Sequence, residues 1–401
     1  MTTDLFDKFD SILTEYNQLP EGELNPFTVT MDSVISPTEA IINGKKTILA
    51  GTNNYMGMTY NQECMDAAEE ALKNFGTGTT GSRVLNGTYH GHKKLEETLK
   101  DFYEADHAIV FSTGYQANLG VIATVAGPKD YVVIDADSHA SIYDGCAMGN
   151  ATIVRFTHND PDNLEKRLAR IRRKDPDAGI LVVIEGVYSM LGDQAPIKEL
   201  AEAAKKHNSF VLVDEAHSIG VFGKTGRGVA QEQGVEHLVD FTVGTFSKSV
   251  GTVGGYCVSN HPKFEALRLV CRPYVFTASL PPSVVASANK ALELIKDSNL
   301  RVKLLENSMR LNKGLDDAGF NMGTTGESPI AAIIIDDKYT AIAYWQHMMQ
   351  QGVYVNLAVP PATPNGLNLM RCSLSAAHSF EQVDYMLEKF IAVGKKLGVL
   401  N

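Results

Sequence analysis

Short apolar runs and amphipathic stretches alternate from Gly51 to about Leu280, and this alternation constrains the fold more than any other feature of the chain. The runs are rich in β-branched residues: HAIVF, YVVID, TIVRF, GILVVIEG, SFVLVDEA and DFTVGTF. The stretches between them, such as PIKELAEAAKKHN, carry apolar residues at helical spacing. Strands that alternate with helices usually pair in parallel, and near-continuous apolar strands are buried on both faces. The region therefore predicts a large α/β domain built on a parallel sheet.

The two ends of the chain depart from this pattern. The beginning predicts a helix, LFDKFDSILTEYNQL, and a hairpin, AIINGKKTILAG, whose Asn-Gly pair favours a tight turn. Near the other end, AAIIID, GVYVNLAV and LNLMRCS predict strands, AIAYWQHMMQQ predicts a helix, and Ser379 with Gln382 forms a capping box before a last helix. We expect an N-terminal arm over residues 1–50, a large domain over 51–285 and a small α+β domain over 286–401.

Charge and composition exclude several classes of function. The chain has 47 acidic and 36 basic side chains, and its net charge of −11 argues against a nucleic-acid partner, which would need a basic face. No stretch approaches the ~20 apolar residues of a membrane span, and the first residues lack a secretory apolar region. The 5 cysteines are dispersed, without a C-x-x-C pair, which favours reduced thiols over disulfides or a zinc site. We therefore expect a cytoplasmic enzyme without a metal.

Two glycine motifs could hold a phosphate, but only one has a suitable context. Gly76, Gly78 and Gly81 satisfy G-x-G-x-x-G, yet the preceding MDAAEEALKNF predicts a helix where the dinucleotide fingerprint needs a strand. We therefore reject a dinucleotide site there. In contrast, the run HAIVF leads into a turn that contains Gly114 and Tyr115, and a helix follows. The N–H groups and positive dipole end of a helix N-terminus suit a phosphate.

Three titratable residues follow predicted strands. Asp214 ends the run SFVLVD, His217 comes three residues later, and His139 lies four residues after YVVID. Ligands of open α/β sheets bind beyond the carboxyl ends of the strands, so these side chains should lie near one site. Taken singly, each has an ordinary structural explanation, such as a capping aspartate or a surface histidine.

Lys248 suggests that these residues belong to one functional site. It lies in TFSKSVG, directly after a predicted strand, where partial burial would lower its pKa and make it a candidate Schiff-base amine. Thr245 and Ser247 would offer hydroxyls to a phosphate beside it. A Schiff-base lysine, an acid for a pyridinium nitrogen, a stacking imidazole and a phosphate cup together are what pyridoxal 5′-phosphate requires. The sequence therefore predicts a site for this cofactor.

At these residues the sequence resembles the fold-type I pyridoxal-phosphate enzymes, and specifically the α-oxoamine synthase family. The resemblance spans nearly the whole chain through TNNYMGM, TTGSRVLNGTYHGHKKLE, FSTGYQAN, DADSHASIYDG, VDEAHSIGVFGKTGRG, GTFSKSVGTVGG, TASLPPS and PPATP…LMRCS. It implies an aspartate aminotransferase-like fold. The segments HASIYDGC, GTFSKSVGTVGGYCVSNHPKFEA, CRPYVFTASLPPSVVA and YVNLAVPPATP are most similar to the bacterial members that use L-serine and palmitoyl-CoA.

The resemblance also implies a role for each site residue. Lys248 would hold the cofactor as a Schiff base, Asp214 would pair with the pyridine nitrogen and His217 with the phenolic oxygen. His139 would stack on the ring and touch the substrate carboxylate. The other implied contacts are Gly114, Tyr115, Thr245 and Ser247 to the cofactor, Thr277 to its phosphate from the neighbouring subunit, and Asn54 and Arg371 to the amino acid. A homodimer with shared active sites follows. Close bacterial relatives carry an arginine just before PPATP, where this chain has Val359.

The implied reaction is a decarboxylative Claisen condensation of L-serine with a long-chain acyl thioester, on CoA or an acyl carrier protein. The products would be 3-ketodihydrosphingosine, CO2 and the free thiol, at the first step of sphingolipid biosynthesis. Lys248 would remove the α-proton, and His139 would donate a hydrogen bond to the oxyanion. Because the product is hydrophobic and must leave toward lipid, it favours a peripheral membrane contact.

Three alternatives to this reaction remain at the level of the sequence. The first is another α-oxoamine synthase, of the glycine C-acetyltransferase, 8-amino-7-oxononanoate synthase or 5-aminolevulinate synthase type. The second is a transaminase or aldolase on the same fold, which would release no CoA. The third is a non-catalytic subunit of a synthase, which would be expected to lack the Schiff-base lysine, whereas Lys248 is present.

Overall fold

The computed structural model describes residues 4–17, 25–324 and 328–400. Within this part of the chain, a seven-stranded sheet has the order β4-β10-β9-β8-β7-β5-β6. Its strands are β4 (His107–Phe111), β5 (Tyr131–Asp135), β6 (Thr152–Phe156), β7 (Ile180–Glu185), β8 (Phe210–Asp214), β9 (Phe241–Thr245) and β10 (Gly255–Ser259). The strands from β6 to β9 pair in parallel, while β10 runs antiparallel to both β4 and β9. The six predicted runs are all strands of this sheet, and β10 was not predicted.

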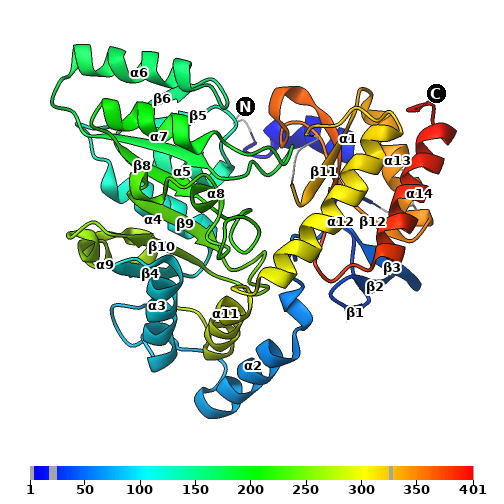
Figure 1. Ribbon diagram of the computed structural model, residues 1–401, viewed down its shortest axis with the longest axis horizontal. Helices are drawn as coiled ribbons and strands as arrows, with labels where there is room; N and C mark the ends of the chain where they lie inside the picture. Colours follow the sequence, from blue (N-terminus) through cyan, green and yellow to red (C-terminus); the bar gives the residue numbers. More distant parts are fainter. Residues whose placement is uncertain (1–3, 18–24, 325–327, 401) are drawn as a thin grey trace.

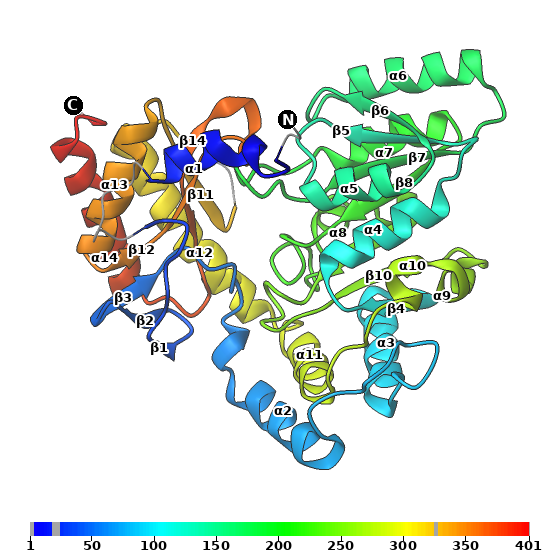
Figure 2. The same cartoon turned by 180° about the vertical axis from the view of Figure 1, so that it is seen from behind.

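Helices cover both faces of this sheet (Figures 1 and 2). They are α3 (His90–Tyr103), α4 (Gly114–Val125), α5 (Ala140–Met148), α6 (Pro161–Lys174), α7 (Ile197–Lys206), α8 (Val229–Glu232), α9 (Leu267–Val270) and α10 (Arg272–Val275). Alternate side chains of one strand enter two apolar clusters: Leu181 and Val183 pack with α4 and α5, whereas Val182 and Ile184 pack with α6 and α7. The prediction of strands buried on both faces is thereby confirmed for the inner strands.

The same prediction is wrong for TIVRF, which forms β6 at one edge of the sheet. Thr152, Ile153 and Arg155 are exposed, and only Phe156 is buried. Edge position alone does not explain this, because β4 at the opposite edge is buried from Ala108 to Phe111. Helix α6 leaves part of β6 uncovered, since the two elements line a cavity of about 440 Å³.

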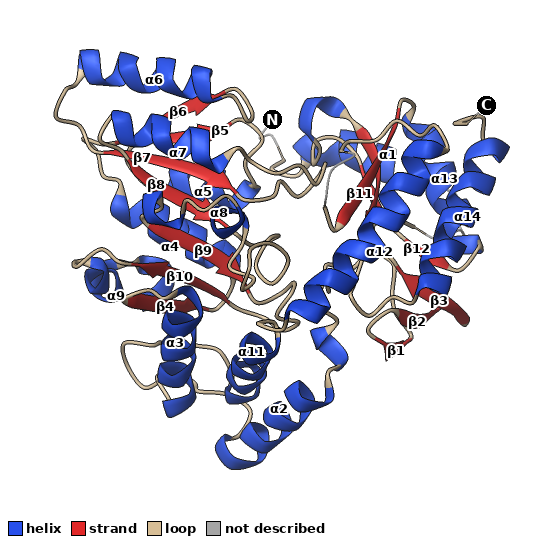
Figure 3. Ribbon diagram, viewed as in Figure 1, coloured by secondary structure: helices blue, strands red, loops and turns tan. Residues whose placement is uncertain are grey.

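A three-stranded antiparallel sheet, of order β11-β14-β13, forms the centre of the C-terminal part (Figure 3). Its strands are β11 (Ile330–Ile335), β13 (Asn356–Ala358) and β14 (Asn368–Ser373), and the helices beside it are α12 (Ser298–Asp317), α13 (Lys338–Gln350) and α14 (Phe380–Lys396). The capping box of Ser379 and Gln382 is confirmed at the start of α14. The predicted strand GVYVNLAV is divided in two, as β12 (Val353–Tyr354) and β13.

The predicted N-terminal hairpin joins the C-terminal part of the chain. It forms β2 (Glu39–Ile42) and β3 (Lys45–Leu49), and β3 pairs in parallel with β12. Strand β1 (Ser33–Ser36), which pairs with β2, was not predicted. Asn43 and Gly44 make the turn with φ of 49° and 69°, as an Asn-Gly hairpin requires. The predicted first helix appears as η1 (Asp7–Phe9) and α1 (Asp10–Asn17), and its last two residues lie outside the described ranges.

Two more helices, α2 (Gln62–Phe75) and α11 (Pro282–Leu294), pack against each other below the large sheet in Figure 1. Helix α2 ends at Gly76, whose φ is 77°, so a helix does precede the rejected glycine motif. The short 3₁₀ helices η2 (Met58–Tyr60), η3 (Glu236–Leu238), η4 (Phe264–Ala266) and η5 (Pro364–Gly366) lie in connections. None of the described helices has the length and apolar character needed to cross a bilayer.

Candidate active site

Eight of the predicted site residues line one cavity of about 250 Å³ at the carboxyl ends of β5, β8 and β9. They are Gly114, Tyr115, His139, Asp214, His217, Thr245, Ser247 and Lys248. Because parallel strands end at the same edge of a sheet, residues that are far apart in the sequence converge there. The structure therefore brings these side chains together at one site, as the sequence predicted.

One wall of the cavity is suited to an anion. Thr113 caps helix α4, and its hydroxyl accepts a hydrogen bond from the N–H of Gln116 at 3.0 Å. A Cβ atom on Gly114 would lie 2.8 Å from Cβ of Thr245, so only glycine lets the turn approach β9 this closely. Thr245 Oγ1 lies 2.8 Å from Ser247 Oγ. Backbone N–H groups at a helix N-terminus and a pair of hydroxyls thus face one space, which is the chemistry of a phosphate cup.

Lys248 supplies the amine of the cavity. It follows β9, its side chain is half-buried, and among the described residues Nζ has no hydrogen-bond or ion-pair partner. Burial lowers the pKa of Lys248 to about 8, although the nearby carboxyl groups of Asp214 and Glu185 act in the opposite direction. An amine that is partly neutral near physiological pH can form a Schiff base.

Two carboxyl groups lie at neighbouring strand ends. Asp214, only 6% exposed, accepts hydrogen bonds at Oδ1 from the N–H of Ala216 (2.9 Å) and at Oδ2 from Asn118 Nδ2 (2.7 Å). Glu185, which the sequence analysis missed, ends β7 as Asp214 ends β8, and this shared position was the signal that could have found it. Burial, and then the charge of Asp214, raises the pKa of Glu185 well above its usual value. Glu185 therefore holds its proton more tightly than an ordinary carboxyl group does.

Hydrogen bonds to its backbone N–H and to its ring hold His139 in place. Its N–H donates to Glu185 Oε1 at 2.5 Å, and its ring caps helix α5, with Nδ1 accepting from the N–H of Ser141 at 3.2 Å. The Ser141 hydroxyl also lies 2.8 Å from Nδ1. Desolvation lowers the pKa of His139, so the ring is predominantly neutral at physiological pH.

A hydrogen-bonded chain connects His217 with Arg371. Burial lowers the pKa of His217 well below its usual value, and its Nδ1 lies 2.8 Å from the hydroxyl of Tyr55. Tyr55 donates to Asn53 Oδ1 at 3.2 Å, and this oxygen also accepts from Arg371 Nη2 at 3.1 Å. Arg371 Nε donates to the carbonyl oxygen of Ser189 at 2.6 Å. Arg371 does not line the cavity itself, but this chain ties it to a residue that does.

Asn54 is not brought into the cavity. Its amide nitrogen donates to Thr59 Oγ1 at 2.8 Å, while the preceding Asn53 faces Arg371. The sequence analysis quoted TNNYMGM but missed Asn53 and Tyr55 as site residues. Neighbouring residues of an irregular loop point in different directions, and no local pattern indicates which of the two asparagines faces inward.

Thr277 also lies outside the cavity lining, although close to it. Its hydroxyl accepts a hydrogen bond from Gln116 Nε2 of the same chain at 3.3 Å, near the N-terminus of α4. The next residue, Ala278, accepts from the Ser112 hydroxyl through its carbonyl oxygen. The segment around Thr277 is therefore held beside the phosphate cup by contacts within one chain.

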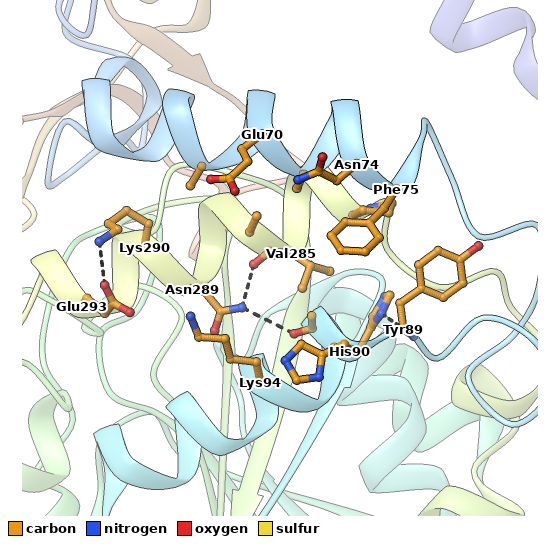
Figure 4. A pocket seen from close by; sticks show the side chains of 16 residues that line it. Glu70, Asn74, Phe75, Tyr89, His90, Lys94, Val285, Asn289, Lys290 and Glu293 are labelled. Carbon is orange, nitrogen blue, oxygen red and sulfur yellow. Dashed lines mark hydrogen bonds and ion pairs between the residues drawn. The ribbon is translucent and has the colours of Figure 1, made fainter.

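A second cavity, of about 290 Å³, lies between α2, α3 and α11 and contains none of the predicted site residues (Figure 4). Phe75 and Val285 contribute to its apolar lining, and Lys290 pairs with Glu293 at 2.8 Å on its rim. Asn289 donates to backbone carbonyl oxygens, as the dashed lines show. Since this cavity lacks a lysine beside an aspartate and a histidine, we place the active site in the first one.

The first cavity fits pyridoxal phosphate by the chemistry of its donors. It offers the Lys248 amine, which has no partner within the described residues, a buried carboxylate, an imidazole and a phosphate cup. These groups stand at the carboxyl edge of a mostly parallel sheet, with a smaller α+β part beside it. Fold and site together define a fold-type I pyridoxal-phosphate enzyme.

Comparison with known proteins agrees with this class. Residues 45–390 match the aminotransferase class I and II family. The chain is 56% identical over 401 residues to serine palmitoyltransferase (SPT) of Sphingomonas paucimobilis, covering 99% of this chain and 95% of that protein. A solved structure of Sphingomonas wittichii SPT is 58% identical, with a TM-score of 0.97 and 100% of both chains covered. A high-resolution structure of an SPT with its PLP internal aldimine is 55% identical, with a TM-score of 0.97, covering 99% of this chain and 100% of that one.

The chain belongs to the aminotransferase class I and II family and, within it, to the α-oxoamine synthases. The family and the fold class predicted from the sequence are confirmed, and so is pyridoxal phosphate as the cofactor.

Proposed function

We propose that the chain condenses L-serine with a long-chain acyl thioester, palmitoyl-CoA or the corresponding acyl carrier protein, and releases CO2 and the free thiol. The product is 3-ketodihydrosphingosine, and the reaction is the first step of sphingolipid biosynthesis. The observation that carries this proposal is the 56% identity to an SPT over 99% of the chain. The cavity supports it, because the residues that such a reaction needs converge there.

The cofactor is held by residues of the large sheet and its helices. Lys248 would form the Schiff base with the cofactor, Asp214 would bind its pyridine nitrogen, and His217 would bind its phenolic oxygen. His139 would stack on the ring, and the cup of Gly114, Tyr115, Thr245 and Ser247 would take up the phosphate. When bound, pyridoxal phosphate supplies an electron sink for the electrons left at the α-carbon of the substrate.

Proton transfer and charge stabilisation fall to Lys248 and His139. The free Lys248 amine would remove the α-proton of serine, and general-base catalysis of this kind contributes typically ~10²–10⁴-fold. His139 donates a hydrogen bond to the oxygen that becomes negative when the thioester carbonyl is attacked. Loss of CO2 and return of a proton to the α-carbon complete the reaction.

Arg371 binds the carboxylate of serine. Its guanidinium is oriented by Ser189 and Asn53, and a rigid fork of this kind suits a carboxylate. Since Val359 stands where close bacterial relatives have an arginine, Arg371 and His139 take over more of this contact. The contact between Asn54 and the substrate stays a prediction. Because the amide of Asn54 is bonded to Thr59, Asn53 is the better candidate for that contact.

The active site is shared between two subunits of a homodimer, with Thr277 reaching the phosphate in the neighbouring subunit. Phe276 is 73% exposed and Leu269 78% exposed, and apolar side chains this open are suited to cover by a partner. We propose a cytoplasmic enzyme that meets the membrane surface when its product leaves. We also propose the division into an arm (1–50), a large domain (51–285) and a small domain (286–401).

The proposed reaction is tested by supplying the holoenzyme with L-serine, glycine or L-alanine, each with palmitoyl-CoA or acetyl-CoA, and measuring the cofactor absorbance and free thiol. We expect the absorbance to shift selectively with L-serine and thiol to form with serine and palmitoyl-CoA. The Lys248→Ala variant should form none. Preference for glycine or alanine with a short acyl donor would move the chain to another synthase of the family.

A further inference from the structure

Asn118 is a polar residue within an apolar helix. It lies in α4, whose sequence is GYQANLGVIATV, and its side chain is only 2% exposed. Ala117, Val121 and Ile122 around it are completely buried. Burying an amide costs free energy unless hydrogen bonds replace those it made to water. The partners of Asn118 therefore indicate its role.

The amide nitrogen of Asn118 bonds to two different elements. It donates to Asp214 Oδ2 at the end of β8, at 2.7 Å, and to Ser141 Oγ in α5, at 2.9 Å. The opposite amide orientation would direct the carbonyl oxygen at a carboxylate oxygen, so Asp214 fixes which atom faces it. Helices α4 and α5 lie side by side along the same face of the sheet (Figures 1 and 2), and Asn118 joins both to the strand.

Ser141 extends this link to His139. Its hydroxyl oxygen accepts from Asn118, so its own hydrogen is free to point to His139 Nδ1, 2.8 Å away. The N–H of Ser141 approaches the same nitrogen at 3.2 Å. With Nδ1 accepting both hydrogens, neutral His139 carries its proton on Nε2. This tautomer is the one that can donate from Nε2 into the cavity.

We propose that Asn118 is a positioning residue that holds Asp214 and, through Ser141, the imidazole of His139 in one arrangement around the cofactor ring. The inference rests on the roles proposed above for Asp214 and His139. The other contacts of these residues, from Ala216 to Asp214 and from His139 to Glu185, use backbone N–H groups and leave the link between them to Asn118. Without the amide, Asp214 loses a donor that stabilises its charged form, and the Ser141 hydroxyl loses the donor that directs its hydrogen to His139.

The first test measures the dissociation constant of pyridoxal phosphate for apoprotein that carries Asn118→Leu. Leucine has the same branched shape but donates no hydrogen bond. We expect the dissociation constant to rise about tenfold, because a hydrogen bond to a charged carboxylate is lost. The matched control is Asn289→Leu in α11, which removes a buried amide, 5% exposed, that bonds to Thr98 and Val285 and does not line the first cavity. Equal cofactor affinity in the two variants and the parent would overturn the proposal.

Two further variants separate positioning from a general loss of stability. Ser141→Ala keeps the bond between Asn118 and Asp214, so cofactor affinity should stay within about twofold of the parent while kcat falls about tenfold and its pH profile changes. Asn118→Asp preserves size but sets a second carboxyl group against Asp214. Its affinity for the cofactor, relative to the parent, should fall as pH rises from about 6 to about 9, because two like charges then face each other.

The pH dependence of Asn118→Asp keeps the proposal testable if Asn118→Leu does not fold. An affinity ratio that does not change with pH would contradict the proposal. Cofactor binding needs neither serine nor a thioester, so these results are independent of whether the proposed substrate pair is correct.

Discussion

At the scale of single residues, the surroundings of Lys248 change the reactivity of its amine. Burial lowers its pKa to about 8, from the value near 10.4 of a solvated lysine. At pH 7 about one molecule in ten then has a neutral amine, compared with roughly one in several thousand for a solvated lysine. Only the neutral amine attacks the aldehyde of pyridoxal phosphate, so reactivity follows from burial.

The rate at which apoprotein forms the Schiff base with pyridoxal phosphate should therefore depend on pH in a characteristic way. We expect about a tenfold rise per pH unit below pH 8 and a plateau above it, followed by the growth of visible absorbance. N-α-acetyl-lysine under the same conditions serves as the control, and its rate should still rise at pH 9.5. A rate for the protein that also kept rising to that pH would contradict a lowered pKa.

The residues that the sequence could predict are those placed directly by a strand. Asp214 and Lys248 stand at or just beyond strand ends, so recognising the strands also placed these side chains at the shared edge. Glu185 ends a predicted strand in the same way as Asp214, but it was not identified from the sequence. Asn118 and Asn53 could not be found, because the direction of a buried amide or a loop side chain depends on neighbours distant in sequence.

At the level of elements, a buried ionic cluster ties α3 to α9. Glu96 Oε1 in α3 accepts from Arg83 Nη2 at 2.8 Å and from Arg268 Nη1 at 2.9 Å, and Glu96 is 3% exposed. Both guanidinium groups also lie over the ring of Tyr274. Removing one partner from a buried ion pair leaves an uncompensated buried charge. The free-energy cost of that charge exceeds the net stabilisation that the intact pair provides.

Glu96→Gln should therefore destabilise the apoprotein by about 3 kcal/mol, measured as the shift of its urea unfolding midpoint multiplied by the slope. The neighbouring Glu97→Gln is the matched control, since Glu97 pairs with Lys100 on the surface and should leave the midpoint unchanged. Equal unfolding midpoints for the two variants would contradict a stabilising role for the buried cluster.

Helices and strands were predictable where the pattern of residues within one segment was enough to define them. Runs of β-branched residues gave the inner strands of the large sheet, and the capping box gave the start of α14. The segment GVYVNLAV reads as one strand, yet β12 pairs with β3 and β13 pairs with β14. A chain that changes from one sheet to another keeps its apolar pattern, so the break becomes visible only through its partners.

For the whole molecule, the main proposal is that two subunits share each active site. The structure holds Thr277 beside its own chain's α4, through Gln116, whereas the family resemblance assigns Thr277 to the neighbouring subunit's phosphate. A dimer that combines one Lys248→Ala subunit with one Thr277→Ala subunit distinguishes the two arrangements. If Thr277 acts across the interface, the remaining intact lysine lies in a site with an intact threonine.

We expect this mixed dimer to bind pyridoxal phosphate at its one lysine-bearing site with the parent affinity. The Thr277→Ala homodimer should bind about tenfold more weakly, because a hydrogen bond to a charged phosphate is missing. Co-expression with two different tags gives the mixed dimer, and absorbance titration gives the affinity. A mixed dimer that binds as weakly as the Thr277→Ala homodimer would assign Thr277 to its own subunit.

The most direct test of the proposed reaction follows the carboxyl carbon of the substrate. L-Serine labelled with ¹³C at that carbon is incubated with the holoenzyme and palmitoyl-CoA, while labelled CO2, free thiol and the lipid product are quantified by mass spectrometry. The account predicts labelled CO2 and thiol in equal amounts, only when both substrates are present, and a long-chain amino ketone without the label. Retention of the label in the product, or thiol release without labelled CO2, would contradict decarboxylative condensation.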